Sequence, residues 1–249
     1  MNKNVLRTLV AGSCLMGASS AMAGLCSDVT FAEFKTAAAS AYADTNGYGF
    51  GLPMWATLVN QTGKVCWVYS VKASGANQGV LAGNKAWLGS RVISAQKANT
   101  ANAFSLNALS ISTGALSVTV YPGGSLYGLQ HSNPVDATVA YAGDFTRLGT
   151  SQDPLVGTKP GGINVFGGGV AVYGAGGSKV GAVGASGDTS CRDHTFAYRM
   201  RVHLGLDNEP NDDGLSLVDS PAALFEIPAC GVNDPTATVY GANDDNGVR

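Results

Sequence analysis

Cysteine carries the most definite chemistry in this sequence. Once a predicted export leader is removed, four cysteines remain, and an even number in an exported chain predicts two disulfides. They are Cys26, Cys66, Cys191 and Cys230. Three pairings are possible. We favour Cys26 with Cys66 and Cys191 with Cys230, because the second bridge would pin a tail that has no core of its own. A structural zinc site is the competing interpretation, but the sequence has no C-x-x-C or paired-histidine spacing.

The leader is a basic and then apolar N-terminal segment. Lys3 and Arg7 flank the start of the apolar run, and the tripeptide Ala-Met-Ala at 21–23 supplies the small residues that a signal peptidase reads. We therefore predict a signal peptide over 1–23 and a periplasmic or secreted single domain over 24–249, with no integral membrane segment. A lipoprotein anchored at Cys14 is the alternative, but its match to a lipobox is only partial.

Charge excludes two classes of partner. Charged residues make up 13% of the 249 residues, with 17 acidic against 15 basic side chains and no basic cluster. Nucleic acid and anionic membrane surfaces are therefore not expected to bind. The weakly charged composition, with 34 glycines, fits an exported protein that buries part of its surface in a homo-oligomer.

Two motifs that look like catalytic signatures fail on spacing. Ser186 lies in a G-A-S-G sequence, in which the second glycine comes one place too early for the nucleophile elbow of a hydrolase. The glycines at 174–177 join two predicted strands, whereas a dinucleotide fingerprint leads from a strand into a helix. Lys97 could act as a general base only if it were buried. We interpret the acidic pair at 212–213 as solvated charge.

Hydrophobic spacing predicts three helices and two hairpins. The predicted helices cover 30–45, 91–109 and 188–206, and the predicted strands cover 54–60, 64–71, 170–173 and 180–185. The proline-containing segment 122–161 is predicted to be an ordered excursion that covers one end of the sheet or contacts another subunit. An irregular acidic tail is predicted over 207–249.

Three segments occur in the order that one known family shows. They are SAQKANTANAF (94–104), GGGVAVY (167–173) and KVGAVGASGD (179–188). Together they resemble the haem-binding or haem-degrading HbpS–GlcG-like family. That family has a K-A-x-T-A-x-x-F helix and a V-G-A-x-G-V-S-G turn that leads into a helix with an early Asp. The likeness covers about 30–206. It departs at Ala171, where the family usually has Pro, and in the long excursion and the cysteines, which indicate an exported branch.

The resemblance implies both a fold and a ligand. The fold is α+β of the profilin-like kind, with a mainly antiparallel sheet of about five strands and helices on both faces. The ligand is haem or a similar planar molecule, whose iron takes an axial ligand from His, Cys, Met or Tyr. His194 is the preferred metal ligand, as a partly exposed histidine in the first turns of the last helix. Tyr198 lies on the same face four residues later, and Arg192 and Arg199 could meet the propionates.

The other two histidines of the mature chain are weaker candidates. His131 lies in the excursion, where an unassigned polar residue is the ordinary interpretation, but it is kept as a possible ligand. His203 follows His194 by nine residues and so points to the opposite face of the helix, which means that one haem cannot be held by both. A surface histidine that only solvates or caps the helix is the alternative for His194.

These observations favour an exported, non-enzymatic and oligomeric binding protein for haem or a similar planar ligand. Two alternatives stay open, because fold does not fix function. One is an enzyme of haem degradation or of other small-molecule redox chemistry. The other is a structural or interaction protein with no haem role.

Overall fold

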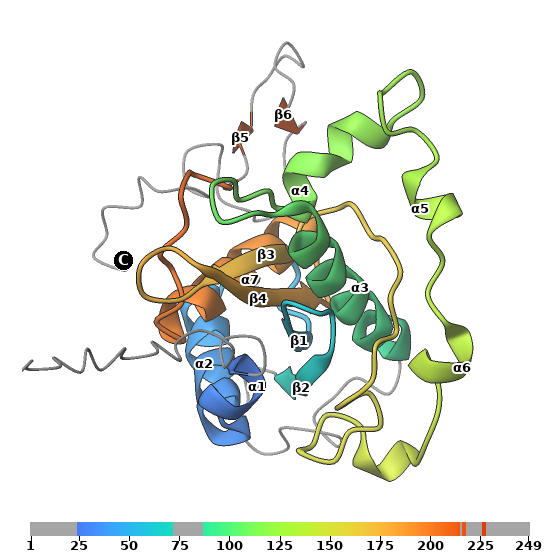
Figure 1. Ribbon diagram of the computed structural model, residues 1–249. Helices are drawn as coiled ribbons and strands as arrows, with labels where there is room; N and C mark the ends of the chain where they lie inside the picture. The colour runs from blue at the N-terminus through green and yellow to red at the C-terminus, as the bar shows by residue number, and fades with distance from the viewer. Residues whose placement is uncertain (1–23, 72–86, 215, 218–225, 228–249) are drawn as a thin grey trace, which may run out of the picture.

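The computed structural model describes residues 24–71, 87–214, 216–217 and 226–227, and it has an antiparallel sheet with helices on both faces (Figure 1). The strands are β1 (Met54–Asn60), β2 (Val65–Val71), β3 (Gly169–Tyr173) and β4 (Lys179–Ser186), in the order β2-β1-β4-β3. All three pairings are antiparallel. The predicted α+β class is confirmed. The sheet has four strands rather than about five, and β5 (Ser216–Leu217) and β6 (Glu226–Ile227) form a separate parallel pair.

Three long helices cover the sheet. α2 (Phe31–Asp44) and α7 (Ser190–His203) pack on one face, and α3 (Leu88–Phe104) packs on the other (Figure 1). α3 ends five residues before its predicted end, because Ser105 turns to extended backbone and Leu106 pairs with Leu109 in a tight turn. Among the described residues, none of the helices combines the length and the apolar character needed to cross a bilayer.

The alternation of β1 explains why the sheet has two apolar faces. Met54, Ala56 and Leu58 belong to the core cluster that includes side chains of α2 and α7. Trp55 and Val59 belong to the second cluster, with the alanines of α3. Since successive side chains of a strand point to opposite faces, one seven-residue strand supplies both cores. The burial of all seven residues of β1 therefore agrees with its position inside the sheet.

Small residues let α3 lie directly on the sheet. A Cβ at Gly184 of β4 would lie 2.0 Å from the carbonyl oxygen of Ser94 and 2.4 Å from the amide nitrogen of Ala98. Only glycine can occupy this position without displacing the helix. Ser94 also bonds to Thr57 of β1, with 2.7 Å between the two hydroxyl oxygens. The buried stripe of α3 is thus centred on Ser94, Ala95, Ala98 and Ala101.

The predicted excursion is ordered and covers the edge of β2. The amide of Val65 donates to the carbonyl of Thr158 at 2.9 Å, and the amide of Gly157 donates back to Val65 at 2.9 Å. Leu148 and Leu155 pack into the core beneath α3. The segment contains the short helices α5 (Leu129–Ser132), α6 (Ala137–Ala140) and η3 (Phe145–Arg147), and it follows α4 (Thr113–Leu116) and η2 (Ser117–Val120). The prediction that the excursion is ordered is confirmed. It covers the side edge of the sheet at β2 and not an end, and its alternative role as a contact with another subunit stays a prediction.

A buried ion pair ties the excursion to α3. Arg91 bonds to Asp153 through two nitrogens, and its Nη1 donates to the carbonyl of Ala140 at 2.9 Å. Asp153 also accepts from the amides of Gly149 and Leu155. Every oxygen of this buried carboxylate is therefore used, as a buried charge requires.

One predicted disulfide is present among the described residues. Cys26 of the first short helix, α1 (Leu25–Asp28), is bonded to Cys66 of β2. Cys191 is also disulfide-bonded, but its predicted partner Cys230 lies outside the described residues, as does the predicted signal peptide over 1–23.

Removing the Cys26–Cys66 bridge is expected to lower the free energy of unfolding by about 2–4 kcal/mol. The bridge spans a sequence separation of 40 and holds the N-terminal helix to β2, so its loss frees a long loop in the unfolded chain. Urea unfolding of the double variant Cys26→Ser/Cys66→Ser, compared with the disulfide-intact protein, measures the effect. An unchanged midpoint and slope would contradict the prediction.

Candidate functional site

The ends of several elements meet at one end of the sheet and border an open hollow of about 560 Å³. β1 begins here and β4 ends here, because Trp55 pairs with Ser186. The lining residues are Phe50, Leu52, Trp87, Gly89, Ser90, Ile93, Phe166, Ser186, Gly187, Asp188, Thr189 and Asp193. They come from the loop before β1, from the starts of α3 and α7, and from the segment before β3. The volume is that of a small-molecule site.

Aromatic side chains form the rim of the hollow. Phe50 is 63% exposed, Trp87 49% and Phe166 37%. Leu52 and Ile93 add aliphatic walls, and both are only partly buried. Exposed aromatic side chains that converge on one hollow are typical of a binding surface rather than of a core. The rim can therefore stack against the faces of a flat apolar ligand.

A buried ion pair lies beneath Phe166. The Nζ of Lys97 is 2.7 Å from Oδ2 of Asp193, donates to the carbonyl of Ala185 at 3.0 Å, and lies 4.0 Å from the centre of the Phe166 ring. The side chains of Lys97 and Asp193 are 0% and 1% exposed. The pair joins α3 to α7 across the end of the sheet, so it holds together the two helices that border the hollow.

Burial shifts both members of this pair towards their neutral forms. It raises the pKa of Asp193 to about 6, against the opposing effect of the Lys97 ammonium. It also lowers the pKa of Lys97, against the opposing effect of the Asp193 carboxylate. Each group depends on the other to stay charged. Lys97 is buried, so the condition stated for it to act as a base is met. Neither side chain, however, is open to solvent.

Gly168 allows the backbone to pass close to the pair. Its φ is +121°, and a Cβ there would lie 2.4 Å from the carbonyl oxygen of Ala185 and 2.9 Å from Nζ of Lys97. Any side chain would clash with the strand end or displace the ammonium group. Glycine before β3 is therefore required by the ion pair.

Asp188 fixes the loop that carries Phe50. Its carboxylate accepts from the amides of Phe50 at 2.9 Å and Leu52 at 2.8 Å, and pairs with Nη1 of Arg192 at 2.7 Å. Although burial alone would raise the pKa of Asp188, these hydrogen bonds hold it below its ordinary value. Its amide in turn donates to Asp193 at 2.9 Å. The rim is thus connected to the buried pair.

His194 and Tyr198, predicted on α7, do not line the hollow. His194 is fully buried, so the expected partial exposure is wrong, and burial lowers the pKa of its imidazole to about 4. Tyr198 is half-buried, and the guanidinium of Arg201 lies 4.9 Å from the centre of its ring. The role of His194 as a metal ligand stays a prediction, and its burial argues against it.

The remaining predicted ligand residues are also outside the hollow. Arg192 is fully buried, with its guanidinium paired to Asp188 and 4.7 Å from the centre of the Tyr42 ring, so it is committed to the protein and not open to propionates. Arg199 is half-buried on α7, and His131 is exposed on α5. Within the described chain, no group of three or more His, Cys, Asp or Glu side chains could hold a metal ion.

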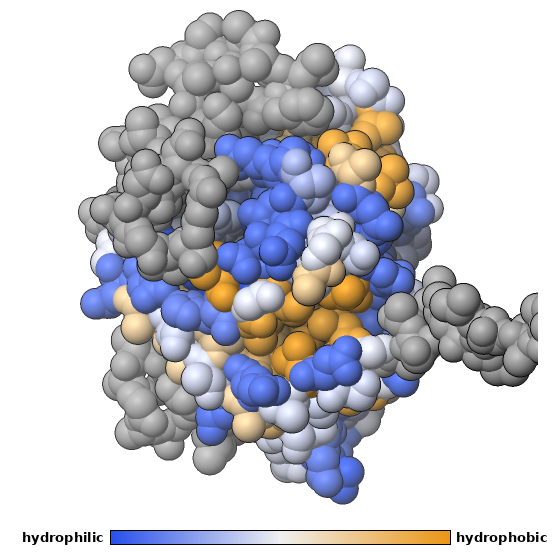
Figure 2. Space-filling model, turned by 60° about the vertical axis from the view of Figure 1, so that its left-hand side comes forward, coloured by the Kyte–Doolittle hydropathy of each residue, from blue (hydrophilic) through white to orange (hydrophobic). Residues whose placement is uncertain are grey.

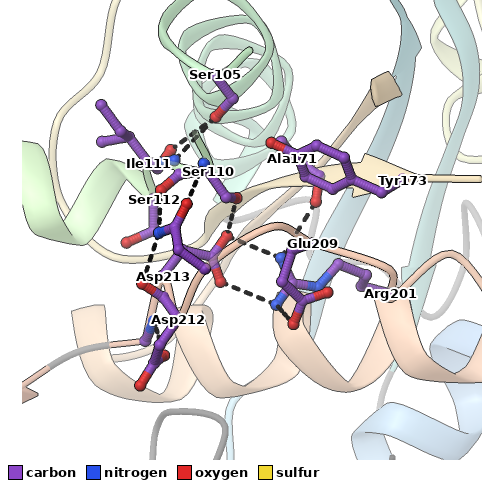
Figure 3. A network of polar contacts seen from close by, with 12 residues as sticks. Ser105, Ser110, Ile111, Ser112, Ala171, Tyr173, Arg201, Glu209, Asp212 and Asp213 are labelled. Atoms are coloured by element: carbon purple, nitrogen blue, oxygen red, sulfur yellow. Dashed lines mark hydrogen bonds and ion pairs between the residues drawn. The ribbon is translucent and has the colours of Figure 1, made fainter. Parts of the chain in front are cut away.

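A second polar network attaches the chain after α7 to the core (Figure 3). Arg201 binds both carboxylate oxygens of Asp213, at 2.8 and 2.9 Å, and its Nη2 bonds to Glu209 at 2.9 Å. Asp213 also accepts from the Ser110 hydroxyl, and Arg201 donates to the carbonyl of Ala171 in β3. Asp213 is 4% exposed, so its interpretation as solvated tail charge was wrong. Sequence analysis missed this network. The signal that could have indicated it is Arg201 on α7, seven residues after His194.

The fold and the hollow together define the class of this protein: an α+β domain whose four-stranded antiparallel sheet lies between helices, with a ligand-sized hollow at one end. The sequence pattern of the family described as "Haem degrading protein HbpS-like" matches residues 55–200. The chain belongs to this family, and the resemblance in the sequence is confirmed. No curated protein matches the chain.

Solved structures with similar folds are distant in sequence. The PduOC:heme complex is 20% identical, with a TM-score of 0.45, over 73% of this chain and 98% of that one. Protein ORFY from Klebsiella pneumoniae is 22% identical, with a TM-score of 0.44, over 71% and 90%. A double mutant of HbpS from Streptomyces reticuli is 13% identical, with a TM-score of 0.35, over 82% and 99%. At these values the likeness carries no conclusion about a site.

Proposed function

We propose that this chain is an exported, non-enzymatic binding protein that holds haem or a similar planar ligand in the hollow between Phe50, Trp87 and Phe166. The observation that carries the proposal is the convergence of three exposed aromatic rings on one hollow of ligand size. Membership of a family described as haem-degrading supports the choice of haem. One of the similar structures is described as a heme complex, which agrees with that choice.

The walls of the hollow suit a porphyrin ring. Phe166 and Trp87 offer faces and edges for stacking, and Ile93 offers an aliphatic surface. α3 starts at the hollow, and its N-cap residue Trp87 makes no side-chain capping bond. Gly89 and Ser90 of its first turn line the hollow, and the helix dipole favours a carboxylate group beside their backbone amides. In this proposal they take the place of Arg192 and Arg199 as propionate partners.

Export and assembly are parts of the same proposal. The Cys26–Cys66 disulfide supports an oxidising compartment, either periplasm or medium. Figure 2 shows the side of the molecule that lies on the left of Figure 1, where apolar residues gather near the middle of the face between hydrophilic ones. Such a surface suits contact with a second copy of the chain. Sedimentation equilibrium with and without hemin would give the number of subunits.

Haem degradation is the alternative that the family description keeps open. It would require turnover, seen as loss of the haem absorption with a reductant and oxygen present. Loss that catalase suppresses would instead be uncatalysed peroxide damage.

Substituting Trp87 by Ala is expected to weaken hemin binding about tenfold, which corresponds to about 1.4 kcal/mol. The substitution removes the largest aromatic surface of the rim and leaves the sheet untouched. Absorbance titration of disulfide-intact protein measures the affinity, with albumin as the reference for nonspecific adsorption. Tyr127→Ala is the matched control, because Tyr127 is 64% exposed on the excursion and outside the hollow.

Two results of this titration would contradict the proposed function. One is a featureless, unsaturable rise with the parent protein, which would indicate adsorption only. The other is an equal loss in both variants, which would place the ligand elsewhere.

A further inference from the structure

The two carboxylates that border the hollow are already satisfied by the protein. Both oxygens of Asp193 are used, one by Lys97 and the other by the amide of Asp188. Both oxygens of Asp188 are used as well, by amides and by Arg192. The side chains of these two acids are 0–1% exposed. Each ion pair is neutral overall, so these four charged side chains offer a ligand neither a free cation nor a free anion.

Among the described residues, the hollow also lacks a usual iron ligand. Protein ligands of haem iron are His, Cys, Met and Tyr, and none of these occurs among the described residues that line the hollow. The sequence from 72 to 86, which precedes Trp87, contains none of them either. The aromatic walls thus fit the porphyrin ring, whereas the donor set does not fit its iron.

We propose that the hollow recognises the flat tetrapyrrole ring itself and not its metal, so that iron-free porphyrin binds as tightly as hemin. This inference rests on the proposed function, because it concerns the same hollow. Its physical basis is that the described lining residues offer aromatic surface but no side chain that usually binds iron. Phe50, Trp87 and Phe166 supply contact area that any flat aromatic ring can use. None of the lining side chains that the structure describes distinguishes a metal centre from two pyrrole N–H groups.

The test compares hemin with protoporphyrin IX on the disulfide-intact protein, both at concentrations where each is monomeric. Absorbance follows hemin, and porphyrin fluorescence follows the metal-free ring. Dissociation constants within about threefold of each other are expected. Phe166→Ala is expected to weaken both ligands by about tenfold, while Phe145→Ala, which removes a 43% exposed ring outside the hollow, leaves both unchanged.

The outcomes separate this inference from the function on which it rests. Hemin that binds at least about tenfold more tightly than protoporphyrin IX, with a Soret shift that a histidine substitution abolishes, would overturn the inference and keep a haem-binding function. His131→Ala and His203→Ala are made for this purpose, and His194→Ala is included where circular dichroism shows that it folds. If neither ligand saturates, both the inference and the proposed function fail.

Discussion

Asp213→Ala is expected to lower the free energy of unfolding by about 3–5 kcal/mol, because it leaves the buried guanidinium of Arg201 without its main counter-charge. Arg201 is fully buried and binds both oxygens of Asp213. Glu209, which is 13% exposed at its side chain, can compensate only in part because it meets a single guanidinium nitrogen. Thermal or urea unfolding followed by circular dichroism measures the loss.

The adjacent residue provides the control for this experiment. Asp212 is exposed, and its side chain accepts from the amide of Gly214. Asp212→Ala is therefore expected to change stability by no more than about 0.5 kcal/mol. Equal effects at the two positions would show that the Arg201 network does not hold the chain after α7 to the core. The comparison thus tests whether residues 207–214 are part of the folded domain.

Lys97→Met is expected to destabilise the protein by about 3–5 kcal/mol at pH 7, because it leaves the Asp193 carboxylate buried without a cation. Met keeps most of the side-chain volume, so the loss is electrostatic and not a cavity effect. The double variant Lys97→Met/Asp193→Asn is expected to recover most of the stability, since the charge and its partner are then both absent. Lys64→Met, at an exposed position, is the control.

The dependence on pH gives the same experiment a second readout. The folded-state pKa of Asp193 is raised to about 6, above its ordinary value of 3.8, so the folded protein holds this proton more tightly than the unfolded chain. The contribution of that proton to stability is therefore fully present below pH 3.8 and is lost as the pH rises through 6. Without Lys97 the carboxyl holds its proton still more tightly. We expect the single variant to regain stability between pH 7 and pH 5 and the double variant not to do so.

A loss below about 1 kcal/mol at pH 7 in Lys97→Met would contradict this account of the ion pair. It would mean that Asp193 finds another partner or water when Lys97 is removed. The rim of the hollow would then be held in place by the contacts of Asp188 alone. We would in that case expect the variant to bind a ligand as tightly as the parent protein does.

Local patterns in the sequence were sufficient for the three long helices, the two hairpins and the family. The β-rich runs on either side of 61–63 and the glycine turn before Lys179 predicted the two hairpins, because a strand and a tight turn are specified by neighbouring residues. Thr30 and Glu33 form the capping box that starts α2 at its predicted position. The end of α3 was predicted less well. Ser105 lies outside the helix, and its hydroxyl bonds to the backbone of Ile111, a contact that the helical repeat does not indicate.

The candidate site depended on contacts between residues far apart in the chain. Lys97 and Asp193 are 96 residues apart, and Phe50 and Asp188 are 138 apart, so no spacing in the sequence could join them. His194 looked suitable because helix position and a neighbouring arginine suggest exposure. The packing of α7 against the sheet buries it instead.

The sequence by itself therefore determined the main helices and strands and the family, each of which depends on local pattern or on residue type. The Cys26–Cys66 pairing was one of three that the sequence left open. Only the tertiary structure decided which charges are buried and which aromatic rings are left exposed together. The reason is physical: the state of a charged or aromatic side chain depends on the solvent and partners around it, and those partners arrive when the ends of β1, β4, α3 and α7 meet.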